Sequence, residues 1–213
     1  MVGGAALIDL AGTWLAHPAP GRALHSENVE FDADHMIERC RLFLLIALGE
    51  TVLTTGTAIA GASMTLMTVV TGASALVGTV ALWALGFGRA GRLTLQYVEA
   101  TSDPVRASRR AGDTLTVMVA GLIAVAVANE EVIAHPREPG SVVLSVLVYG
   151  GPTLFLVAQG WYFWVVLHAR PRLHLIGSIA LLLGGLATFS APRAVASLFV
   201  AASLSAMAIL DRP

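Results

Sequence analysis

Long runs of apolar residues constrain this chain more than any other feature. A helix needs about 20 mostly apolar residues to cross the hydrocarbon core of a membrane. Six stretches meet or approach that length, and a seventh at the start of the chain is shorter. Continuous runs of this kind predict helices, because the backbone in lipid must satisfy its own hydrogen bonds. The expected helices cover about 2–16, 36–60, 66–88, 114–134, 141–167, 173–190 and 193–210.

The composition leads to the same class of protein. Charged residues make up 13% of the 213 residues and hydrophobic residues 56%, whereas about a quarter of an ordinary soluble domain is charged. The formal net charge of -1 excludes a basic nucleic-acid-binding protein. We therefore predict an all-α fold, a single polytopic membrane helix bundle over residues 1–213 with six to seven transmembrane helices in the lipid bilayer.

The arginines predict the orientation of these helices. The positive-inside rule places the side with more basic residues in the cytoplasm. One set of connections, together with the C-terminal tail, holds nine arginines, and the opposite connections hold only Arg137 and Arg193. The C-terminus is therefore expected in the cytoplasm. The arginine cluster within 89–113 is expected to contact anionic lipid head groups there.

The segment 35–50, HMIERCRLFLLIALGE, carries ionisable residues into the second of these stretches. At about 100° per residue, Arg39 and Glu50 differ by only about 20° around the helix axis, and His35 lies within about 60° of Glu50. The three side chains therefore share one helix face. Glu50 lies about 16 Å beyond Arg39 along the axis, which predicts that Glu50 is near the middle of the bilayer.

Glu50 has two interpretations. A carboxylate at this depth is costly, so we expect it to face the bundle interior as a protonatable or cation-binding group. Gly49 beside it would allow another backbone to approach, and Thr54 would add a hydroxyl on the next turn. In the other interpretation Glu50 is a neutral, hydrogen-bonded acid that only locks helix packing.

The start of the same segment resembles a metal site only in part. His35 and Glu38 have the i, i+3 spacing that metal ligands on a helix can show, but one such pair alone does not complete a metal site. This favours capping and ion pairing at the membrane boundary, shared with Arg39 and Arg41. We predict no metal and no cofactor. The sequence shows no catalytic motif either, so we expect no enzyme.

Several further polar residues remain open. Asp9 is a second intramembrane carboxyl if 2–16 spans the membrane, and a solvated one if it does not. Asn129 and Glu130 either line an outer vestibule or are solvated at a helix end. Gln159 and Tyr162 are expected to form hydrogen bonds inside the bundle. Stripes of small residues, which let membrane helices approach closely, occur at Ser74 and Gly78, at Ala120, Ala124 and Ala128, and at Ser197, Ala201 and Ser205.

Several motifs resemble those of a known family. HMIERCRLFLLIALGETVL, LWALGF, GLIAVAVANEEVIAHP and VYGGPTLFLVAQ follow one another in the chain. They resemble the bacterial low temperature requirement protein A family. The resemblance implies a multi-pass protein of the bacterial cytoplasmic membrane, here corresponding to a C-terminal half of the longer family architecture. It also points to His35, Glu38, Arg39, Gly49 and Glu50 as the positions that matter.

Two functional hypotheses follow from these residues. The first is a transporter or channel-type protein in which Glu50 is the protonatable or cation-binding group, with Arg39 and His35 controlling access from the cytoplasm. The alternative is a non-transporting membrane scaffold or regulatory subunit. Such a subunit would assemble with another copy of the chain or with a separate N-terminal half.

Overall fold

The protein is described by a computed structural model over residues 33–88 and 104–211, and the regular structure in these ranges is helical. The predicted all-α fold is confirmed. The expected helix at 2–16 lies outside the described residues. The helices of the described part are α2 (Ala33–Gly61), α3 (Leu66–Phe87), α5 (Pro104–Ala134), α6 (Val142–Val165), α7 (Arg172–Ala187) and α8 (Arg193–Leu210).

Among the described helices, five are long and apolar enough to cross a membrane, and α7 with 16 residues is shorter. The membrane-compatible spans are Glu38–Gly61, Leu66–Phe87, Arg110–Ala134, Val142–Val165 and Arg193–Leu210. A multi-pass membrane protein is therefore supported by the length and composition of its helices.

Helix α5 begins ten residues earlier than the sequence predicted, at Pro104 instead of 114. A proline is well tolerated in the first turn of a helix, where its missing N–H has no intrahelical partner. The added residues carry three arginines, and the membrane-compatible span of the helix starts at the third of them, Arg110. Apolar length therefore located the membrane span but not the true start of the helix.

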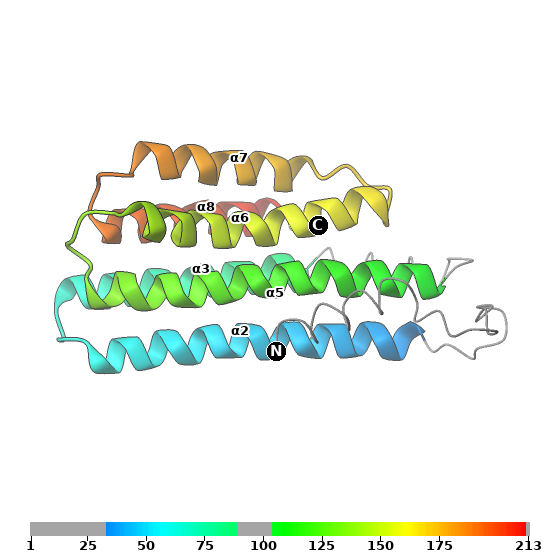
Figure 1. Cartoon of the computed structure of the whole chain (residues 1–213), viewed down its shortest axis with the longest axis horizontal. Helices are drawn as coiled ribbons and strands as arrows, with labels where there is room; N and C mark the ends of the chain where they lie inside the picture. The colour runs from blue at the N-terminus through cyan, green and yellow to red at the C-terminus, as the bar shows by residue number, and fades with distance from the viewer. Residues whose placement is uncertain (1–32, 89–103, 212–213) are drawn as a thin grey trace, which may run out of the picture. The chain divides into compact units, whose positions relative to one another are not determined.

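Successive helices of the described part run in opposite directions (Figure 1), so their ends gather at two boundaries. At one boundary the beginning of α2 meets the end of α3, where the Arg41 guanidinium lies 5.7 Å from the centre of the Phe87 ring. Arg170 and Arg172 lie in the α6–α7 connection and at the start of α7, and they belong to the same boundary. We call it the arginine-rich boundary.

At the opposite boundary, the loop before α6 and the loop before α8 are joined by backbone hydrogen bonds. The Arg193 amide donates to the Glu138 carbonyl at 3.0 Å, and the Gly140 amide donates to the Ala191 carbonyl at 3.2 Å. The Arg193 side chain adds ion pairs to Glu138 at 3.0 Å and to Glu131 at 3.4 Å. Two connections distant in sequence are therefore held together.

The interior is formed by α3, α5, α6 and α8, flanked by α2 and α7. Helix α5 packs against both α6 and α2, α3 packs against α8, and α6 packs against α7. Large side chains that are almost completely buried fill the centre, among them Leu82, Leu85, Leu122, Phe155, Leu156, Leu181 and Leu204.

The approach of α5 to α6 depends on two glycines. A Cβ added to Gly121 would lie 2.7 Å from the Gly151 carbonyl oxygen and 3.1 Å from the Phe155 amide nitrogen. Only a glycine, which has no Cβ atom, fits at position 121. The stripe predicted on this helix is displaced, because Ala128 is buried but Ala120 is exposed.

The predicted stripes on α3 and α8 do meet. The hydroxyls of Ser74 and Ser197 share a hydrogen bond at 2.6 Å. A Cβ on Gly78 would lie 3.9 Å from the Ala201 Cα. Small residues therefore bring these two helices together, as expected for helices packed in a membrane.

Candidate functional site

Helix α2 has one face turned toward its neighbours. Leu44, Leu48, Thr51 and Thr55 are buried on this face. They recur at intervals of three and four residues, as one side of an α-helix requires. The Thr51 and Thr55 hydroxyls donate to carbonyls one turn earlier in α2, at 3.0 and 2.8 Å. The two hydroxyl groups on this buried face therefore find their hydrogen-bond acceptors within α2.

Glu50 lies on another face of α2, about 160° around the axis from Leu48, and its side chain is exposed. The apolar residues of that face are exposed too, with Leu42 at 52%, Ile46 at 68% and Leu53 at 61%. Among the described helices this face therefore lies on the outside, and the expectation that it points into a bundle interior stays a prediction. No described helix covers it.

His35 and Arg39 are exposed as well, and so is Glu38. The regular helix from Ala33 to Gly61 keeps His35, Arg39 and Glu50 on one side, as the spacing predicted. Within the described ranges, no group of three or more His, Cys, Asp and Glu side chains is placed to hold a metal ion.

Gly49 and Gly56 border this exposed face. An added Cβ at either position would meet nothing within 4 Å, so there is room for another backbone against α2. Thr54 is half-buried at the edge of the face, and its carbonyl accepts a hydrogen bond from the Thr57 hydroxyl at 2.9 Å. Asp9 lies outside the described residues. We call the surface formed by Arg39, Leu42, Ile46, Glu50 and Leu53 the open face of α2.

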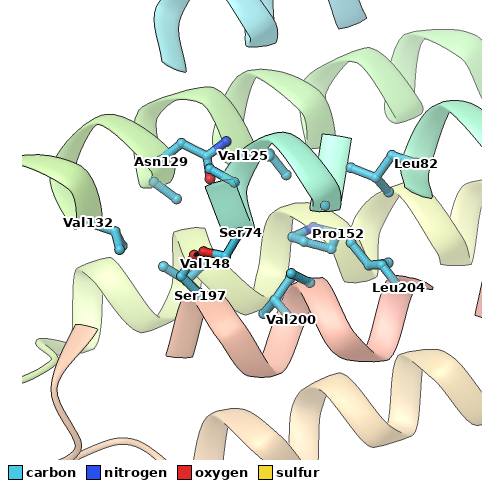
Figure 2. A pocket seen from close by; sticks show the side chains of 14 residues that line it. Ser74, Leu82, Val125, Asn129, Val132, Val148, Pro152, Ser197, Val200 and Leu204 are labelled. Atoms are coloured by element: carbon cyan, nitrogen blue, oxygen red, sulfur yellow. Dashed lines mark hydrogen bonds between the residues drawn. The ribbon is translucent and has the colours of Figure 1, made fainter. Parts of the chain in front are cut away.

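A second polar region lies inside the bundle. The Asn129 side-chain amide on α5 donates to the Thr55 hydroxyl on α2 at 3.3 Å. Figure 2 shows Asn129 beside a small cavity whose lining also includes Ser74 and Ser197. The cavity measures about 30 Å³, which is room for about one water molecule.

Asn129 therefore lines an internal cavity, whereas its neighbour Glu130 is exposed at the end of α5. The sequence prediction treated these two residues together, as lining a vestibule or as solvated at a helix end, but their surroundings differ. They are consecutive on a helix and so point in directions about 100° apart.

A third polar group connects α3, α6 and α7. The Gln159 amide donates to the Leu85 carbonyl at 2.8 Å, and its oxygen lies 2.9 Å from the His174 Nε2. Gln159 and His174 are both buried, and the His174 ring lies 5.0 Å from the Phe163 ring. The predicted interior hydrogen bonds of Gln159 are confirmed. The role of His174 was missed, although its place on the first turn of a short apolar helix was visible in the sequence.

Comparisons with known proteins agree with the motifs. A model of the family described as bacterial low temperature requirement A protein (LtrA) matches residues 2–209. An uncharacterized protein of Rhizobium meliloti (strain 1021) is 30% identical over 152 residues, which cover 71% of this chain and 37% of the relative. The matched part thus spans little more than a third of that relative's length. No solved structure gives a significant match.

Proposed function

Because this chain belongs to the bacterial low temperature requirement A (LtrA) family, and is a membrane protein of that type, we propose that it serves in proton or cation transport. In this proposal Glu50 is the titratable group at the open face of α2. Arg39 and His35 control access to it from the arginine-rich boundary, which we place on the cytoplasmic side of the bacterial inner membrane.

The depth of Glu50 carries the proposal. It lies near the middle of the Glu38–Gly61 span. Charged side chains at the centre of a membrane helix cost roughly 3 kcal/mol on insertion scales. Because the described helices do not cover Glu50, it needs a protonated state, an aqueous path or a membrane partner. Each of these suits a group that exchanges a proton or a cation.

The route implied by this arrangement follows the outside of α2. The internal cavity beside Asn129 has room for about one water molecule and is lined largely by apolar side chains such as Val125 and Val200. In contrast, Gly49 and Gly56 leave open space along the open face. A seam between α2 and another membrane segment would enclose Glu50 and provide a path.

Ion flux into proteoliposomes containing the purified full chain tests the proposal. We expect Glu50→Gln to lower proton or cation flux at least about ten-fold, as loss of an essential charged group would. Glu130→Gln, an exposed carboxyl at a helix end, is the matched control and should leave flux unchanged. Full flux in a correctly folded Glu50→Gln protein would remove Glu50 from the mechanism, and absence of flux in the unaltered protein would reject transport.

The alternative function is that of a non-transporting scaffold or regulatory subunit. The open face itself favours it, because apolar side chains and accessible glycines suit helix–helix association. The covering segment would come from another copy of the chain or from a separate N-terminal membrane half. The matched relative is long enough to contain such additional segments.

Cross-linking at the open face separates the possible partners. In a Cys40→Ser background, Leu53→Cys should form a disulfide-linked dimer in the membrane if another copy covers α2. Leu210→Cys, which is also exposed but lies on α8, is the control and should not. A chain that stays monomeric and shows no cross-link to any membrane protein would count against the scaffold function.

A further inference from the structure

We propose that a groove between the end of α6 and the start of α7 binds an anionic phospholipid. The groove has a volume of about 250 Å³ and is lined mainly by apolar side chains, including Val157, Trp161, Trp164 and Leu175. It is separate from Glu50 and from the internal cavity. The proposal therefore holds whether or not the protein transports ions.

The groove opens sideways, toward the lipid. Val157 is 52% exposed on α6, and Leu175 is 62% exposed on α7. Trp161 and Trp164 belong to the last turns of α6 and are 42% and 67% exposed. Tryptophan side chains prefer the depth of the lipid head groups. An acyl chain in the groove would therefore have its head group beside these rings.

The polar atoms at the base of the groove already have partners. His174 and Ser178 are buried there. The His174 ring is hydrogen-bonded to Gln159 at 2.9 Å, and the Ser178 hydroxyl donates to the His174 carbonyl at 2.8 Å. A polar ligand would gain few hydrogen bonds from this base, whereas a hydrocarbon chain needs none. The chemistry of the lining thus favours an acyl chain.

Charge at the mouth of the groove selects the head group. Pro171 lines the groove, and the residues on either side of it, Arg170 and Arg172, are both exposed. The chain contains no acidic residue between Glu138 and Asp211, so α6, α7 and their connection present only basic charge. Helix α7 starts here without a side-chain cap, and the positive end of its dipole adds to the attraction. A lipid head group with net negative charge fits this mouth.

Native mass spectrometry of the detergent-purified full chain tests the proposal with two lipids of equal chain length. Phosphatidylglycerol is the anionic probe and phosphatidylcholine the zwitterionic one. Each basic residue near the head groups should favour the anionic lipid by about five-fold. We therefore expect the unaltered protein to bind phosphatidylglycerol at least about five-fold more tightly.

Charge variants separate this site from general attraction to the protein. Arg170→Gln combined with Arg172→Gln should bring the two lipid affinities close to equality, and each single change should remove part of the preference. Arg137→Gln, at the opposite boundary, is the control and should keep the full preference. If the double variant does not fold, the two single variants decide. Equal binding of both lipids by the unaltered protein, or a preference that survives loss of the arginines, would overturn the proposal.

A variant that fills the groove tests the acyl-chain contact. Val157→Trp places a larger side chain in the groove at an exposed position, so the fold should persist while the affinity for phosphatidylglycerol falls several-fold. Leu154→Trp is the matched control, because Leu154 is exposed on the same helix but does not line the groove. Unchanged affinity in the Val157→Trp protein would show that the lipid binds elsewhere.

Discussion

The most apolar parts of α2 and α6 have equal mean hydropathy, yet the chain buries these parts to very different extents. In the most apolar part of each span, 22% of α2 is buried against 50% of α6. Glycines show the same difference. Gly151 on α6 would press an added Cβ against the backbone of α5 at 3.0 and 3.1 Å, whereas Gly49 and Gly56 on α2 have nothing within 4 Å.

This difference separates two uses of an apolar membrane helix. Helix α6 has close packing partners within the described helices, and its Gly151 is in backbone contact with α5. Helix α2 is packed on one side and presents a glutamate, accessible glycines and large aliphatic side chains on the other. The first helix supports the fold, and the second is suited to function or assembly.

The largest expected effect contrasts two glycines. Gly121→Leu should destabilise the protein by about 3 kcal/mol or prevent folding, because backbone atoms of α6 cannot move aside for the new side chain. Gly56→Leu should leave thermal unfolding in detergent nearly unchanged, since its surroundings are open. Similar melting temperatures for the two variants would show that α5 and α6 are not in the close contact described.

The next effect contrasts the two faces of α2 itself. Leu48 is 4% exposed and Ile46 is 68% exposed. Leu48→Ala should cost about 1–3 kcal/mol from lost packing, somewhat less than in a water-soluble core because lipid is itself apolar. Ile46→Ala should stay within about 0.5 kcal/mol, as surface substitutions usually do. Chemical denaturation of the isolated chain in micelles measures both, and a larger loss for Ile46→Ala would reverse the assignment of the faces.

A smaller effect is expected from the polar contacts at α6. Gln159→Leu would leave the Leu85 carbonyl and the His174 ring without the hydrogen bonds that Gln159 supplies. The cost should be about 1–2 kcal/mol, the upper part of the range measured for hydrogen bonds between membrane helices. Unfolding of Gln159→Leu, His174→Leu and the double variant tests the coupling. Strict additivity would show that the two side chains do not interact.

The smallest effect concerns the contact between α3 and α8. The hydrogen bond between Ser74 and Ser197 should give a coupling energy of about 0.6 kcal/mol, the average for such pairs in membranes. A double-mutant cycle with Ser74→Ala and Ser197→Ala measures it. Because alanine is as small as serine, the two helices should still pack in these variants. A coupling energy much larger than this would mean that the hydroxyl groups, and not the small side chains, hold the contact.

Much of the fold could be predicted from the sequence, because membrane helices must be long and apolar. The small residues at Ser74, Gly78, Ser197 and Ala201 also predicted a real contact. On α5 the same reasoning selected Ala120, which is exposed, instead of Gly121. Alanine and glycine both count as small, but only glycine allows the backbone-to-backbone contact found there.

The candidate site was predicted less completely. Helical spacing correctly grouped His35, Arg39 and Glu50 on one side of α2, because spacing depends only on local geometry. Helical spacing does not show which side of α2 packs against the other helices of the chain. In lipid, the outward and inward sides of a helix are both apolar, so Leu42, Ile46 and Leu53 resemble a buried face in sequence while lying exposed.

The contact between Ser74 and Ser197 also has a consequence for the synthesis of the protein. Its two residues are 123 positions apart, and the loops joined through Glu138 and Arg193 likewise depend on the last part of the chain. Because a chain emerges from the ribosome N-terminus first, α3 is inserted long before its partner exists. The contact between α3 and α8 therefore forms only after α8 has been synthesised, and a ribosome that stops before α8 leaves α3 without that partner.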